Sequence, residues 1–171
     1  TEPSVSKEMY IEMNGYQIST TLGGFRTVYS VYDPNDEVSE VGLVYGLGKY
    51  ATENEMTIDS QSKYVTNHKG TIEIGRLDNF TFGDNPDASS YAMTMTFGNV
   101  PADFYGEKMM VRAYAKMKDG SVSYTAINTT TIYDVADVLY QNRKMTNKDS
   151  HDYLYQNILS KVQPSYKEVD Y

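Results

Sequence analysis

Tyrosine is the most frequent aromatic residue in this sequence and the first candidate for chemistry with a ligand. The chain contains 17 Tyr, 5 Phe and no Trp. Tyr32 and Tyr114 have the opposite parity to the apolar residues of their segments, which predicts that both rings face solvent. Tyr50 and Tyr64 lie in a polar stretch between residues 49 and 69. A tyrosine ring offers an apolar face and a hydroxyl group, which suits sugar rings or a wet protein interface.

These four residues, Tyr114, Tyr32, Tyr50 and Tyr64, are therefore the predicted binding residues. The alternative is that tyrosine is the strand-forming aromatic of this chain and that its rings are half-buried in the sheets. The absence of Trp, the usual platform in carbohydrate-binding modules, favours this alternative.

Other motifs that could indicate a catalytic or cofactor site are better explained as turns or surface residues. Residues 46–51 match the G-x-G-x-x-A dinucleotide pattern, but the polar residues that follow show no apolar helical stripe, so we predict a turn. His68 and His151 have polar neighbours and no His or Cys at zinc-site spacing, so we predict solvated surface positions. No G-x-S-x-G motif is present, and cysteine is absent. We predict no catalytic residue, no bound metal and no cofactor.

Two acidic loops keep a calcium alternative open. Asp33, Asp36 and Glu37 form one loop and Asp84 and Asp87 the other, but neither has EF-hand spacing, so turns are the first interpretation. A glycosidase needs two carboxyl groups about 5–10 Å apart across a cleft, and the sequence gives no sign of such a pair.

The net charge of −8 and the pI near 4.7 restrict the classes of partner. Nucleic acids and anionic lipids call for clustered Lys and Arg, so neither is expected as a partner. No apolar run approaches 18 residues, so no membrane insertion is expected. The polar N-terminus without Met indicates a processed form or an excised fragment.

Alternation with a period of two predicts antiparallel strands along most of the chain. It is clearest in Met109–Met117, where the odd-numbered residues are apolar and the even-numbered ones include Arg112, Tyr114 and Lys116, which predicts one buried and one wet face. Gly120 indicates a hairpin turn after it. Further strands are predicted at 9–13, 16–19 (after an Asn14-Gly15 turn), 25–32, 41–45, 71–74, 80–82 and 91–97, with at most one weak strand, near residues 57–58, in the 49–69 insertion.

The C-terminal part changes to a helical period. Asp134 is a candidate cap for a helix with Val135, Val138 and Leu139 on one stripe. A second helix is predicted from about Asp149 to Pro164. We therefore predict an all-β antiparallel sandwich at residues 1–133, with a two-helix appendage at 134–171 packed on it.

Short turn and strand motifs resemble those of a known group of modules. They are Gly-Tyr-Gln-Ile at 15–18, Gly-Phe-Arg at 24–26, Glu-Val-Gly at 40–42, Val-Pro-Ala-Asp-Phe-Tyr at 100–105 and Arg-Ala-Tyr at 112–114. Over about residues 8–136 the chain resembles Ig-like or fibronectin type III-like C-terminal modules of secreted or cell-surface proteins of gut Firmicutes. The resemblance implies an Ig/fibronectin-like sandwich and an extracellular setting, and it carries no catalytic residues.

The expected function follows from these observations together. We expect a non-catalytic extracellular module, part of a larger multidomain chain, that serves adhesion, spacing or scaffolding on a secreted or surface bacterial protein. The first alternative is a carbohydrate-binding module that uses exposed Tyr, and a lesser one is a glycoside hydrolase. The expected partner is an extracellular glycan or a surface protein.

Overall fold

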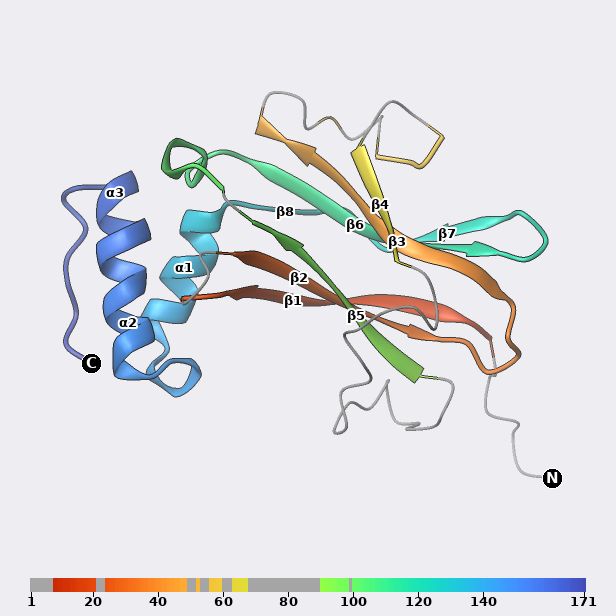
Figure 1. Ribbon diagram of the computed structural model, residues 1–171, viewed down its shortest axis with the longest axis horizontal. Coiled ribbons are helices and arrows are strands. Elements are labelled where there is room, and N and C mark those ends of the chain that lie inside the picture. The colour runs from red at the N-terminus through yellow and green to blue at the C-terminus, as the bar shows by residue number, and fades with distance from the viewer. Residues whose placement is uncertain are drawn as a thin grey trace.

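The computed structural model describes residues 8–20, 24–48, 52, 56–59, 63–67, 90–98 and 100–171, with the backbone alone for 63–67, 90 and 91. Over these residues the protein is mostly β, with two antiparallel sheets and a helical C-terminal part (Figure 1). The sheets form two layers, and the helices lie across one end of them (Figure 1). The predicted all-β sandwich architecture with C-terminal helices is confirmed at this level.

The first sheet has the order β1-β2-β5 and the second the order β4-β3-β6-β7, with β8 also paired to β6. All these pairings are antiparallel. The strand bounds are β1 Tyr10–Ile18, β2 Phe25–Tyr32, β3 Val38–Leu47, β4 Lys63–Asn67, β5 Ser90–Phe97, β6 Met109–Met117, β7 Val122–Tyr124 and β8 Asn128–Thr130.

The helical part follows β8 directly. Its elements are α1 Ile132–Gln141, the 3-10 turn η4 Arg143–Met145, α2 Lys148–Leu154, the π-helical turn η5 Tyr155–Leu159 and α3 Ser160–Val162, while a further 3-10 turn, η3 Ala102–Phe104, precedes β6. No helix in the described part of the chain is long and apolar enough to span a membrane.

The β6 strand is buried on both faces, which corrects the prediction of one wet face. Its residues Val111, Ala113 and Ala115 lie in the main core, as the alternation predicts. On the other face, Met110 and Tyr114 form a second apolar cluster with Val44 and Met56. Met56 comes from a distant segment, so local periodicity carries no sign that this face is covered.

The N-terminal strand also differs from the prediction. Asn14-Gly15 is not a turn but a β-bulge inside one continuous strand, since the pairing of β1 with β2 shifts register between Met13 and Gly15. Gly15 has a φ of +133°, a backbone conformation that favours glycine. In the 49–69 insertion the strand is β4, and Thr57 and Ile58 form a turn instead. The strands predicted at 71–74 and 80–82 lie outside the described residues.

Helix α1 begins three residues earlier than the candidate cap Asp134 predicts. Its cap is Thr131, whose hydroxyl accepts from the Asp134 backbone N–H at 2.9 Å. Its buried stripe is Ile132, Ala136 and Tyr140 rather than Val135, Val138 and Leu139, and Val138 is 64% exposed. The buried residues of α1 belong to the same core cluster as the inner strands, so this helix packs on the sheets.

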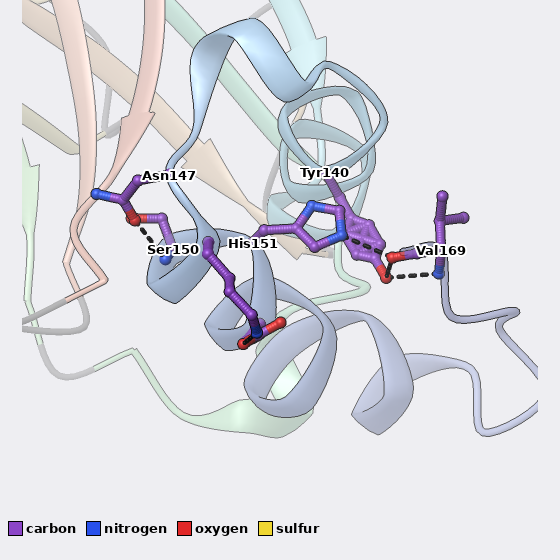
Figure 2. Close-up of polar contacts among 7 residues, drawn as sticks. Tyr140, Asn147, Ser150, His151 and Val169 are labelled. Carbon is purple, nitrogen blue, oxygen red and sulfur yellow. Dashed lines mark hydrogen bonds and ion pairs between the residues drawn. The ribbon is translucent and has the colours of Figure 1, made fainter. Parts of the chain in front are cut away.

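The C-terminal segment is anchored to the helices by a polar cluster (Figure 2). The Tyr140 hydroxyl donates to the Val169 carbonyl at 2.9 Å and accepts from the Val169 N–H at 2.7 Å. His151 Nε2 donates to the same carbonyl at 2.7 Å, and its ring stacks on Tyr140 at 3.9 Å between centroids. Because His151 is only 2% exposed, the predicted surface position is wrong.

The face assignment of β6 generates a stability prediction. Val111→Asp places an unpaired charge at a fully buried position, so we expect the free energy of unfolding to fall by about 3 kcal/mol or more. Lys116→Asp, on the same strand at an exposed position, should change it by about 0.5 kcal/mol at most. Urea unfolding measures both, and equal midpoints for the two variants would contradict the assignment.

The Val169 anchor generates a second prediction. Tyr140→Phe keeps the ring but leaves the Val169 N–H without its acceptor, so we expect a loss of about 1–3 kcal/mol in unfolding free energy. Tyr155→Phe is the matched control, because its ring stacks near Tyr140 and its hydroxyl has no hydrogen bond in the described structure. Thermal or urea unfolding should separate the two variants, and indistinguishable stabilities would rule out the anchoring role.

Candidate functional site

Two of the four predicted binding tyrosines, Tyr32 and Tyr114, are buried in the described structure. Tyr114 is 0% and Tyr32 is 4% exposed, so the prediction that these rings face solvent is wrong. Tyr114 belongs to the second apolar cluster, and its hydroxyl donates to Glu40 Oε2 at 2.7 Å. Tyr50 lies outside the described residues, and the Tyr64 side chain does too, although its backbone pairs with Val44 in β3.

In the acidic loop after β2, the Asp33 carboxylate has a structural role. Asp33 is 3% exposed, and its two oxygens accept from the backbone N–H groups of Glu37 at 2.8 Å and Val38 at 3.1 Å. Asp36 forms an ion pair with Lys118 at 3.1 Å. Within the described residues no group of three metal-ligating side chains comes together. Asp84, Asp87 and His68 lie outside the described residues.

A groove of about 700 Å³ lies between the β1–β2 hairpin and the C-terminal helices, and it is a candidate site in the described part of the chain. The hairpin side includes Asn14, Gln17, Thr20, Arg26 and Val28. The helical side is formed by Leu139, Met145, Thr146, Ser150 and Leu154. A volume of this size falls within the range of about 300–1,000 Å³ that is typical of small-ligand sites.

The hairpin side is shaped by strand register. Gln17 lies directly opposite Arg26 across the β1–β2 pair, so both project from the same face of the sheet. The bulge at Asn14-Gly15 interrupts the regular register of this edge strand where it lines the groove. A Cβ added to Gly15 would meet nothing within 4 Å, so the glycine is required by its φ and not by crowding.

The helical side is held by caps and by the C-terminal segment. Asn147 caps α2 through an oxygen that accepts from the Ser150 N–H at 2.8 Å (Figure 2). The Tyr171 hydroxyl donates to the Thr146 carbonyl at 2.9 Å. The Thr20 and Ser150 hydroxyls are 3.1 Å apart and hydrogen-bond the hairpin to α2. The Thr20–Ser150 hydrogen bond joins the two sides of the groove, and the other two contacts hold the helical side together.

The groove combines one positive charge with neutral polar groups over apolar side chains. Arg26 is the charged residue among the described lining residues, and they include no carboxylate. Amides, hydroxyl groups, Leu139 and Leu154 surround it. Such a lining can hydrogen-bond and pack against a small polar ligand.

Sequence reasoning missed this site because its residues come from opposite ends of the chain. In the sequence Arg26 stands out only within the Gly-Phe-Arg motif at 24–26, and the Asn14-Gly15 pair predicts a turn. Treating residues 10–18 as one bulged strand would have placed Gln17 opposite Arg26 on one face. No local sequence pattern predicts that α1 and α2 lie beside this hairpin.

Burial of Tyr16 generates a prediction at alkaline pH. Burial raises the pKa of Tyr16 to about 12, and burial together with the hydrogen bond to Asp137 raises that of Tyr166 to about 12. The unfolded chain loses these protons near pH 10, earlier than the folded chain, so stability should fall as the pH rises from about 10 to 12. Phenolate absorbance at 295 nm should show late titration that decreases in Tyr16→Phe and in Tyr166→Phe. Loss of an early-titrating group instead would contradict the assignment.

Comparisons with known proteins identify no family. No family model matches the sequence, and a search of curated proteins found no match. Among solved structures, a DUF3823 family protein from Bacteroides ovatus is similar at 11% identity and a TM-score of 0.40, covering 72% of this chain and 56% of that protein. A protein with the provisional name ApaA from Bordetella pertussis is similar at 10% identity and a TM-score of 0.36, covering 76% of this chain and 98% of that one. The chain therefore spans little more than half the length of the first of these proteins.

Proposed function

We propose that this chain is a non-catalytic, extracellular module of Ig/fibronectin-like type, carried by a secreted or cell-surface bacterial protein for adhesion or scaffolding. The strand order supports the Ig-like part of the proposal. Strands β1, β2 and β5 share one sheet and β3, β6 and β7 the other, as strands A, B, E and C, F, G do in Ig domains. Strand β4 extends the second sheet next to β3, as the extra strands of variable-type domains extend theirs.

The composition of the groove supports a binding role and carries the proposal. Its amide and hydroxyl groups can exchange hydrogen bonds with a polyhydroxylated ligand, while Leu139, Leu154 and Val28 offer apolar contact. Glycan binding is therefore the form of adhesion that the groove favours. A glycoside hydrolase would place two carboxyl groups in the site, and the described lining residues contribute none.

A glycan array followed by calorimetric titration tests the proposal. We expect a saccharide ligand whose affinity falls by about fivefold or more in the double variant Asn14→Ala/Gln17→Ala, since each lost hydrogen bond is worth about 1 kcal/mol. Both amides are exposed, so stability should hardly change. Gln156→Ala on η5 is the matched control, an exposed amide that does not line the groove.

Two outcomes would contradict the proposal. If no saccharide on the array or in millimolar titration is bound, the glycan-binding function falls. If a bound saccharide keeps its affinity in the double variant, the ligand contacts another surface and the groove is not the site.

A further inference from the structure

We propose that the groove selects saccharides that carry a carboxylate, with Arg26 as the residue that holds the acidic group. This inference rests on the proposed glycan-binding function and specifies its ligand class. It starts from a positive charge in the groove that the described structure leaves without a counter-ion.

Arg26 is half-buried and lines the groove from β2. Across the sheet it is flanked by Gln17 on β1 and Thr96 on β5. In the described part of the chain its guanidinium forms no ion pair or hydrogen bond, unlike Arg112, which donates to two backbone carbonyls. A half-buried guanidinium without an internal partner is suited to an external anion.

The charge of the described lining residues is opposite in sign to that of the whole chain. The chain has a net charge of −8, yet the described lining residues contribute one cation and no acid. The first acidic residue on the same face of β1 and β2 is Glu12, opposite Ser30, four residues along β2 from Arg26. Among the described lining residues, the charge therefore favours an anionic group at Arg26.

The geometry of the guanidinium group favours a carboxylate as the bound anion. Its planar fork donates two parallel hydrogen bonds to a carboxylate, and such charge-assisted bonds are about twice as strong as neutral ones. One guanidinium balances the single charge of a uronic acid. The flanking amides of Gln17 and Asn14 are then available for the hydroxyl groups of the same or the next ring.

Matched acid and ester ligands test the inference on the whole chain. The probes are trisaccharides of galacturonic, glucuronic and mannuronic acid, each compared with its methyl ester, which keeps the ring and removes the charge. In calorimetric titration at low salt we expect at least one acid to bind about tenfold more tightly than its ester. Added salt should weaken the acid more than the ester.

Three variants identify the residue responsible. Arg26→Gln should remove the preference for the acid, and Arg26→Lys should retain part of it because the charge remains without the fork. Arg143→Gln, which removes an equal charge outside the lining, should change the affinity by no more than about twofold. Melting temperatures of all three variants establish that they are folded.

The outcomes separate this inference from the proposed function. Esters that bind as tightly as the acids, with binding still dependent on Asn14 and Gln17, would overturn the acid selectivity and leave the glycan-binding function standing. An acid preference that survives in Arg26→Gln would overturn the role of Arg26. No binding of either form, together with a negative glycan array, would remove the proposed function itself.

Discussion

The pairing of β3 with β6 is the constraint on which the rest of the structure depends. These strands are paired from Val38 to Leu47 and from Met109 to Met117, and both faces of the pair are buried. On the inner face Leu43 lies opposite Ala113 in the main core. On the outer face Gly42 lies opposite Tyr114, which belongs to the second cluster. A sheet covered on both sides excludes water from its ladder, so register errors here would bury the wrong side chains in two cores at once.

The candidate site lies where this double-layered core ends. The first sheet meets the C-terminal helices through Ile132, Ala136 and Leu154, which share the main cluster with the inner strands. The helices thus stand beside the edge strand β1, and the groove is the space left between them. Its shape depends on the Val169 anchor and the Tyr171–Thr146 bond, since both restrain the segments that form its helical side.

The sequence predicts most of the strands and helices, whose patterns are local, but not the burial of side chains that segments distant in sequence cover. Strands β2, β5 and β6 form where their period-two patterns predict strands, and the helical part ends before Pro164 as expected. The sequence pattern predicts a solvent-facing Tyr114 because the Met56 segment, which packs against it, is far away in sequence. His151 has polar sequence neighbours, yet Tyr140 and Val169 enclose it from other elements. The net charge of −8 likewise averages over the chain and conceals the positive charge of the groove.

Tyrosine hydroxyl groups join distant segments of this protein by hydrogen bonds. The chain has no cysteine, and Tyr hydroxyls link elements far apart: Tyr16 donates to Asn128 at 2.5 Å, Tyr114 to Glu40 and Tyr171 to Thr146. Each such ring contributes apolar burial and one directional bond, a combination that Phe lacks. Tyrosines engaged in this way cannot also serve as free stacking platforms. Under the proposed function, recognition would therefore fall to groups that make no internal contacts, and in the described groove these are the side-chain amides of Asn14 and Gln17 and the guanidinium of Arg26.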